Sequence, residues 1–307
     1  MRSFAREVEG FEFPKAKGDA EYLSLKYSYP LWMTQKLINE YGEECCRELY
    51  EENSRSHGVF IRVNTLKTST DELIEILKSE GINCKKTHID GCLQVSGRLS
   101  IDNSAAYNKG LYSLQNISSQ MAVAALAPKP GDTVIDMCAA PGGKSCAIAE
   151  KMENCGKVLS FDVFEHKVDL IKKSAQRLGI DIIDARLQDG TVCLAELENL
   201  ADCVLADVPC SGLGVIHKKP DIKWRRTEED IKELCRIQKD ILRTAAAYVK
   251  PGGTLVYSTC TILPEENRLQ TDEFLREYGE FKKLSEEQIL TGELGESGFY
   301  ICKMMKG

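Results

Sequence analysis

The stretch TVIDMCAAPGGKS, residues 133–145, places a short apolar strand directly before a turn with two adjacent glycines. Glycines in a turn between a strand and a helix let backbone amides approach a ligand closely. The turn matches neither the dinucleotide fingerprint GxGxxG nor the phosphate loop GxxxxGKS, because only two adjacent glycines precede Lys144. Taken alone, it predicts a tight connection from strand to helix.

Four further apolar segments follow along the chain, with helix-patterned sequence such as HKVDLIKKSAQRLG (166–179) between them. They are KVLSFDV (157–163), IDARLQ (183–188), ADCVLADV (201–208) and TLVYST (254–259). The alternation predicts an α/β fold in which helices cover a doubly wound, mainly parallel sheet. Ligands of such sheets bind beyond the carboxyl ends of the strands.

The amino-terminal part has a different pattern. Residues 1–20 are charged and lack clear periodicity, so we expect a linker or arm. Residues 29–53 carry apolar side chains at helical spacing, and Gly42 divides them into two short helices. A strand at VFIRVN (59–64), a helix over 69–81 capped by Ser69 or Thr70, and strands at CKKTHI (84–89) and CLQVSG (92–97) follow.

These signals predict a small α+β domain over 21–112, followed by the α/β domain over 113–307. An open sheet packed on helices can present a face to single-stranded RNA, although the aromatic stacking signature of an RNA recognition motif is not visible. A structural cap on the neighbouring domain explains the pattern equally well.

Composition excludes several classes of protein. The net charge of −7 argues against a surface coated with basic side chains for indiscriminate nucleic-acid binding. There is no apolar leader segment and no uninterrupted apolar run of roughly 18 residues, so we expect a cytoplasmic protein without a membrane segment. Thirteen cysteines without CxxC pairs and only four histidines predict reduced thiols, with no metal site and no disulfide framework.

Acidic residues and cysteines follow the predicted strands. Asp162 ends the second strand, about 20 positions after the glycine turn, where a carboxylate accepts hydrogen bonds from ribose hydroxyls. By itself Asp162 is better explained as a cap for the next helix. Together with the turn, it favours a ligand that contains adenosine.

The third, fourth and fifth strands deliver further polar groups. Asp189, in the sequence LQDGT, is by itself a common turn former. Asp207 ends the fourth strand and is followed by Pro209 and Cys210. This places a carboxylate that can donate or accept a proton close to a thiol. Cys260 follows the fifth strand, so two thiols are expected near one cleft, although simple burial is the ordinary role of a cysteine.

The order and spacing of these segments resemble the Sun family of RNA cytosine methyltransferases. The segments are DMCAAPGGKS (136–145), FDV (161–163), QDG (188–190), ADVPCSGLGV (206–215), PDIKW (220–224) and STCTILPEEN (258–267). The resemblance runs from about Tyr22 to the end and includes RVNTLK, LQNISSQMA and GFYICKM. It implies a class I, Rossmann-like methyltransferase that uses S-adenosylmethionine to form 5-methylcytosine in RNA, with small-subunit (16S) ribosomal RNA as the expected substrate.

The resemblance also implies roles for single residues. The residues expected to bind the cofactor are Cys138, Ala139, Ala140, Pro141, Gly142, Gly143, Lys144, Asp162, Asp189 and Asp207. Cys260 is similar to the family's nucleophile, which adds to carbon 6 of cytosine so that carbon 5 can take the methyl group. Asp207 is expected to hydrogen-bond the base, and Cys210 to be needed for release of the product. DNA cytosine methyltransferases use the Pro-Cys thiol as nucleophile, so the choice between the two thiols is testable.

The sequence IHKKPDIKWRR, residues 216–226, is here called the basic segment. Its cations are the expected contact for RNA phosphates, with Trp224 available for stacking. They are Lys218, Lys219, Lys223, Arg225 and Arg226. A solvated charge run, with Trp224 in the core, is the alternative. His217 stands where relatives often carry arginine, and we assign it no role.

The family usually carries an additional amino-terminal helical RNA-binding domain, which residues 1–20 do not supply. We expect a monomer whose partner is an RNA substrate, with no metal and no membrane. The same chemistry on transfer RNA, and a noncatalytic RNA-binding factor in ribosome assembly, are the alternatives. The presence of Cys260, Cys210 and Asp207 together argues against the noncatalytic factor, because a binding protein needs none of them.

Overall fold

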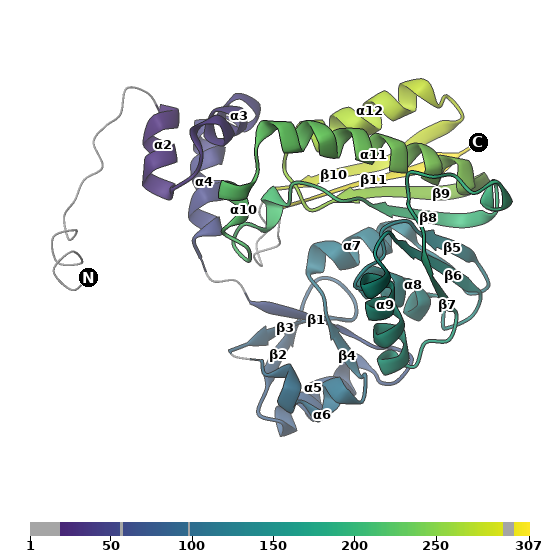
Figure 1. The fold of residues 1–307 in the computed structure, drawn as a ribbon. Coiled ribbons are helices and arrows are strands. Elements are labelled where there is room, and N and C mark those ends of the chain that lie inside the picture. The colour runs from purple at the N-terminus through teal and green to yellow at the C-terminus, as the bar shows by residue number, and fades with distance from the viewer. Residues whose placement is uncertain (1–18, 56–57, 98, 291–297) are drawn as a thin grey trace. The chain divides into compact units, whose positions relative to one another are not determined.

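The computed structural model describes residues 19–55, 58–97, 99–290 and 298–307. Contacts divide the chain into two compact units (Figure 1). The first, called the helical unit, contains the described residues up to Arg55 together with Ile216–Thr227. The second, called the sheet unit, contains the described residues from Gly58 to Val215 and from Glu228 to Gly307.

The helical unit consists of short helices. They are α2 (Asp19–Tyr27), α3 (Leu31–Tyr41), α4 (Glu43–Asn53) and α10 (Ile222–Arg225). Gly42, with φ of 83°, separates α3 from α4, so the predicted pair of helices is confirmed. Helix α2 was not predicted, and it begins at Asp19, so it includes the last two residues of the predicted linker or arm. The rest of that linker lies outside the described residues.

The sheet unit begins with a four-stranded antiparallel sheet in the order β2-β3-β1-β4. Its strands are β1 (Val59–Val63), β2 (Asn83–Lys86), β3 (Cys92–Ser96) and β4 (Tyr112–Leu114). Its helices are α5 (Thr70–Ser79), α6 (Ala105–Asn108) and the 3-10 turn η1 (Ile101–Asn103). Ser69 is the N-cap of α5 and forms a capping box with Glu72. Of the two predicted caps, Ser69 and Thr70, Ser69 is therefore confirmed.

The second sheet has seven strands in the order β10-β11-β9-β8-β5-β6-β7. The parallel strands are β5 (Thr133–Asp136), β6 (Lys157–Asp162), β7 (Ile183–Leu187), β8 (Ala201–Asp207) and β9 (Val249–Thr259). The edge strands β10 (Phe281–Ile289) and β11 (Phe299–Lys306) run antiparallel. The predicted mainly parallel α/β fold is confirmed, whereas the antiparallel edge was not predicted.

Helices cover both faces of this sheet (Figure 1). One face carries α7 (Ile117–Leu126), α8 (Gly143–Lys151) and α9 (Glu165–Leu178), and the other carries α11 (Glu228–Tyr248) and α12 (Arg268–Glu277). The remaining 3-10 turns are η2 (Ala195–Leu197), η3 (Leu213–Val215) and η4 (Pro264–Glu266). Consecutive strand residues such as Val134 and Ile135 are both buried, one in each of two core clusters, because side chains alternate between the faces.

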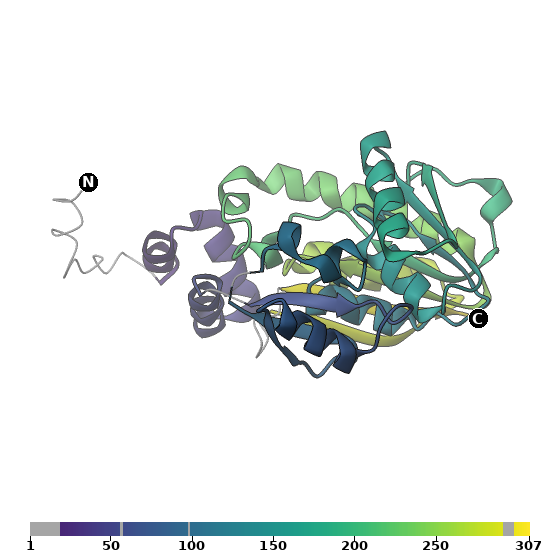
Figure 2. The same ribbon diagram turned by 90° about the horizontal axis from the view of Figure 1, so that it is seen from below.

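The small sheet is joined to the parallel sheet by buried polar contacts. Arg62 of β1 forms an ion pair with Glu150 of α8, and the Asn64 amide donates to the Leu178 carbonyl at 2.9 Å. In Figure 2 the small sheet lies in front of the parallel sheet. These contacts hold the small sheet and the parallel sheet together in one compact unit, and the division into domains over 21–112 and 113–307 stays a prediction.

Within the described ranges, no helix has the length and apolar character needed to cross a bilayer. The same residues contain no group of three or more histidine, cysteine or acidic side chains that could hold a metal ion.

Candidate active site

Acidic side chains and a thiol gather at the carboxyl ends of the parallel strands. Asp136, Asp162 and Asp207 are the last residues of β5, β6 and β8, and Cys260 directly follows β9. Strand β5 lies in the middle, because β6 and β7 follow on one side of it and β8 and β9 on the other. The crevice where the strand order reverses is the usual ligand site of such a sheet.

The glycine turn leads into the amino terminus of α8. Gly142 has φ of 99°, and a Cβ atom there would lie 3.0 Å from Ile171 Cα, so only glycine allows the turn to pack this closely on α9. The Gly143 carbonyl accepts a hydrogen bond from the Arg62 guanidinium at 2.8 Å. The turn is therefore held from the small sheet as well as from α9.

Asp136 lies fully buried beneath this turn. Its Oδ2 atom accepts a hydrogen bond from the Ser145 hydroxyl at 2.7 Å, and Ser160 donates in turn to Ser145 at 2.9 Å. Burial raises the pKa of Asp136 to about 6, and the Ser145 hydrogen bond opposes that shift. Sequence reasoning assigned no role to this carboxyl group.

Asp162 is only 8% exposed and does not cap the following helix. Helix α9 begins at Glu165 with Phe164 as its N-cap residue and no side-chain cap hydrogen bond, so the capping alternative is wrong. Asp162 Oδ1 accepts the Phe164 backbone N–H at 3.2 Å and lies 3.7 Å from the Lys167 ammonium. The carboxylate is thus oriented at the end of β6 by the turn that follows it.

Asp189 is exposed and organises its own turn. Its Oδ1 atom accepts the Thr191 backbone N–H at 2.9 Å and the Thr191 hydroxyl at 2.8 Å. Asp189 therefore forms a turn, as its sequence context predicts, and it lies after β7 at the edge of the sheet. Its predicted contact with the cofactor stays a prediction.

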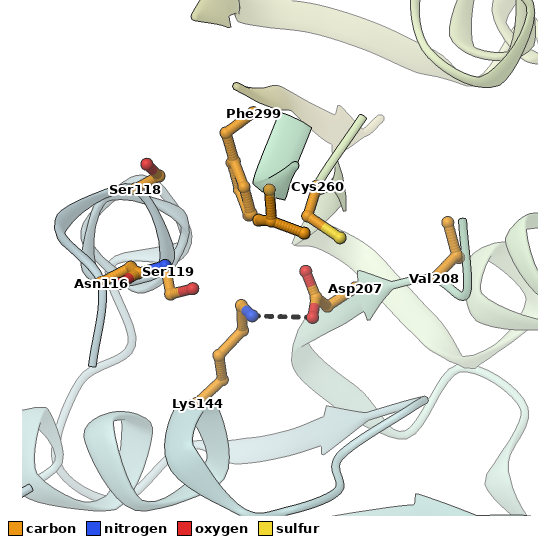
Figure 3. A pocket seen from close by; sticks show the side chains of 9 residues that line it. Asn116, Ser118, Ser119, Lys144, Asp207, Val208, Cys260 and Phe299 are labelled. Carbon is orange, nitrogen blue, oxygen red and sulfur yellow. Dashed lines mark hydrogen bonds and ion pairs between the residues drawn. The ribbon is translucent and has the colours of Figure 1, made fainter. Parts of the chain in front are cut away.

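A pocket of about 170 Å³ opens between Lys144, Asp207 and Cys260 (Figure 3). The Lys144 ammonium donates to Asp207 Oδ2 at 2.7 Å, and the Ser258 hydroxyl donates to Asp207 Oδ1 at 2.7 Å. Burial lowers the pKa of Lys144, but the charge and the hydrogen bond of Asp207 outweigh burial, so the pKa is raised. Both oxygens of Asp207 are thus held, and Lys144 stays a cation beside the pocket.

The two predicted thiols meet at this pocket. Cys210 Sγ and Cys260 Sγ lie 3.1 Å apart, which is hydrogen-bonding distance for sulfur. The hydrogen bond with Cys210 lowers the pKa of Cys260, and the positive charge of Lys144 acts in the same direction, whereas burial and the negative charges of Asp207 and Glu266 oppose the shift. The same hydrogen bond raises the pKa of Cys210 well above its ordinary value. The arrangement therefore favours Cys260 as the thiolate and Cys210 as the proton donor.

The cations of the basic segment, which lies in the helical unit, differ in their surroundings. Lys218, Lys219 and Arg225 are exposed. The Lys223 ammonium donates to the Tyr27 carbonyl at 3.2 Å, so it is partly used in packing. Trp224 is 60% exposed, which contradicts the alternative that it belongs to the core.

Besides Asp136, three residues near the site received no role from sequence reasoning, although they lie in the segments that carry the resemblance. Ser258 and Glu266 belong to STCTILPEEN, and Arg62 belongs to RVNTLK. Their polar side chains inside otherwise apolar or loop segments were the available signal. Their partners are distant in sequence, so only the folded chain identifies what they do.

Comparisons with known proteins agree with this architecture. Residues 123–301 match the family described as 16S rRNA methyltransferase RsmB/F, and residues 29–102 match the RsmF/B-like, ferredoxin-like domain. The probable ribosomal RNA small subunit methyltransferase B of Bacillus subtilis is 38% identical over an alignment that covers 100% of this chain and 72% of the relative.

Solved structures are similar as well. A methyltransferase homolog protein from Pyrococcus horikoshii is 30% identical, with a TM-score of 0.83, over 95% of this chain and 100% of that one. The structure of NSun6 from Pyrococcus horikoshii with SFG shares the fold, with a TM-score of 0.77 and 23% identity over 97% of this chain and 99% of that one. The amino-terminal match is to a ferredoxin-like domain and not to the family's usual helical one. From these similarities along its length, the chain belongs to the RsmB/F family of S-adenosylmethionine-dependent RNA methyltransferases.

Proposed function

We propose that the chain transfers a methyl group from S-adenosylmethionine to carbon 5 of a cytosine in small-subunit ribosomal RNA, through a covalent adduct with Cys260. The observation that carries the proposal is the thiol pair at 3.1 Å beside the Lys144–Asp207 ion pair. Cytosine carbon 5 is a poor nucleophile, and a thiolate next to a proton-handling carboxylate is what its activation requires.

The residues at the strand ends fit the cofactor. Asp162 is oriented at the end of β6 for the ribose hydroxyls, with Asp189 at the end of β7 for the adenine side. Val163, Phe164 and Leu187 remain exposed at the same strand ends, where an adenine ring would cover them. The turn Cys138–Lys144 would surround the methionine and ribose parts. When bound, S-adenosylmethionine supplies an electrophilic methyl group.

The pocket residues account for activation of the base. The Cys260 thiolate adds to carbon 6, and the electron pair of the carbon 5 to carbon 6 bond becomes available at carbon 5. Asp207, with Lys144 hydrogen-bonded to it at 2.7 Å, takes up the proton that the Cys260 thiol loses and shares it with ring nitrogen 3 as negative charge develops there. Carbon 5 would then take the methyl group as the bond between that group and the cofactor sulfur breaks, and the electron pair of the broken bond would stay on sulfur.

Release reverses the addition. Water takes the proton from carbon 5, the double bond re-forms, and the bond between carbon 6 and the Cys260 sulfur breaks. Cys210, 3.1 Å from that sulfur, donates a hydrogen bond to the departing thiolate and so makes it a better leaving group. This division of roles makes Cys260 the nucleophile and Cys210 the residue needed for release.

For RNA binding we propose the basic segment and the α+β region over 21–112. Lys218, Lys219 and Arg225 are exposed cations, and Trp224 is an exposed aromatic ring suited to stacking. Such contacts hold RNA without specifying its sequence, so the choice of target depends on the fold of the RNA as well.

The test is transfer of radiolabelled methyl groups from S-adenosylmethionine to unmodified small-subunit ribosomal RNA. Cys260→Ala is compared with the matched control Cys155→Ala, which removes an exposed thiol of the same chain. Label recovered as 5-methylcytosine with the wild type and the control, and absent with Cys260→Ala, supports the proposal. Equal transfer by Cys260→Ala would remove Cys260 as nucleophile. In a parallel assay with unmodified transfer RNA, label that enters transfer RNA but not ribosomal RNA would reassign the substrate.

A further inference from the structure

Glu266, in the η4 turn that follows Cys260, is a fully buried acidic residue whose role the chemistry above leaves open. Among the described residues, no cation lies within ion-pair distance of it. A buried carboxylate without a cation is costly, so its presence calls for hydrogen bonds that compensate the lost water.

Those hydrogen bonds come from the loop that carries Cys210. The Ser211 backbone N–H donates to Glu266 Oε1 at 2.7 Å, and the Ser211 hydroxyl donates to Oε2 at 2.5 Å. The Gln238 side-chain amide of α11 donates to Oε1 at 3.0 Å. Three donors thus converge on one carboxylate, and two of them belong to the residue directly after Cys210.

The backbone of Glu266 is held by β9, the strand that Cys260 directly follows. The Tyr257 hydroxyl of β9 donates to the Glu266 carbonyl at 2.6 Å. The Gln238 amide also donates to the Pro209 carbonyl at 2.9 Å, and the Ser211 and Thr261 hydroxyls lie 2.8 Å apart. Ser211 therefore contacts the Glu266 carboxylate directly, whereas Pro209 is connected to it through Gln238 and Thr261 through Ser211.

We propose that Glu266 is a positioning residue: its buried carboxylate fastens the Cys210 loop to the segment after Cys260, and so holds the Cys210 thiol where it donates to the Cys260 sulfur. The inference about product release rests on the proposed function. The inference about thiol geometry does not, because it concerns only the folded chain.

The charge of Glu266 acts on both thiols. It raises the pKa of Cys210, whose pKa is raised first by the hydrogen bond to Cys260 and by burial. It also raises the pKa of Cys260, whereas the positive charge of Lys144 lowers the pKa of Cys260. The charge of Glu266 therefore does not distinguish the two thiols, and its role rests on the contacts that hold the Cys210 loop.

The first experiment needs no RNA. Diamide accepts two electrons and two protons from a pair of thiols, so the rate at which it closes a Cys210–Cys260 disulfide reports how often the two sulfurs meet. In Glu266→Gln, an amide N–H faces the Ser211 donors, and we expect closure to slow by about tenfold or more, since small misplacements of reacting atoms have effects of this size. Peptide mass spectrometry follows the bond, and alkylation of the exposed Cys155 serves as internal reference.

Two variants separate positioning from general loss of stability. Glu150→Gln alters another buried carboxylate of the sheet unit and should leave the closure rate unchanged. Ser211→Ala removes only the hydroxyl contact to Glu266, keeps the backbone N–H contact, and should slow closure by a smaller factor. Wild-type closure rates in both Glu266→Gln and Ser211→Ala would overturn the proposal.

The second experiment uses the methyl-transfer assay. Glu266→Gln should still form the protein–RNA adduct but release it slowly, and Glu266→Asp, which keeps the charge, should restore part of the release rate. A merely destabilised protein would lose adduct formation and release together, which would overturn the positioning role. A wild-type chain that transfers no methyl group overturns the proposed function, and the diamide rates still decide the role of Glu266.

Discussion

Replacement of Arg62 by methionine tests how the small sheet supports the cofactor turn. Arg62 is 7% exposed, and its Nε and Nη2 atoms lie 2.8 and 2.9 Å from the two oxygens of Glu150. Its Nη1 atom donates to the Gly143 carbonyl at 2.8 Å and also to the Gln115 amide oxygen. Methionine preserves much of the apolar stem but removes every donor.

The expected cost follows from the state of Glu150 after the change. That carboxylate stays buried without a cation, and breaking a buried ion pair from one side costs about 3–5 kcal/mol in free energy of unfolding. Replacing both partners with apolar groups removes the stranded charge, so Arg62→Met/Glu150→Leu should lose much less than Arg62→Met alone. The difference between single and double variants is therefore diagnostic.

Urea unfolding followed by circular dichroism gives the free energies, with wild type, both single variants and the double variant in one cycle. A loss below about 1 kcal/mol for Arg62→Met would refute the reasoning, because that is the range of exposed ion pairs. Calorimetric titration with S-adenosylmethionine supplies the functional readout. Weaker binding is expected, since the Gly143 carbonyl loses its donor.

Four further outcomes are expected. Cys210→Ala should accumulate a protein–RNA adduct through Cys260, visible as a slowly migrating species on a denaturing gel; its absence would count against the division of roles. Asp162→Ala should weaken cofactor binding more than RNA binding, and unchanged calorimetric affinity for the cofactor would remove Asp162 from the site. Replacing the five cations of the basic segment should weaken RNA binding and reduce the slope of affinity against salt, whereas an unchanged slope would make that segment a bystander. Gly214→Ala places a Cβ atom against the Gly298 carbonyl and 2.9 Å from the Cys260 carbonyl, so it should reduce adduct formation strongly; wild-type adduct rates would show that this loop adapts.

Local sequence patterns predicted the helices and strands that are determined by residues close together in the sequence. The five parallel strands follow from short apolar runs before turns, and the cap of α5 from Ser69 three residues before Glu72. Helix α2 and the edge strands β10 and β11 were missed. Strand β10 exposes most of its side chains, so its sequence carries too few apolar residues to reveal it.

The sequence by itself determined the α/β class and the chemical groups at the strand ends, because alternating apolar runs and their terminal polar residues are local properties. It could not determine how those groups meet. The 3.1 Å contact between Cys210 and Cys260 joins residues 50 positions apart, and the Arg62–Glu150 pair joins residues 88 positions apart. Only the tertiary structure decided that Glu266, which follows Cys260 in the sequence, accepts hydrogen bonds from the loop that carries Cys210. Burial and the convergence of hydrogen-bond donors depend on packing between distant segments.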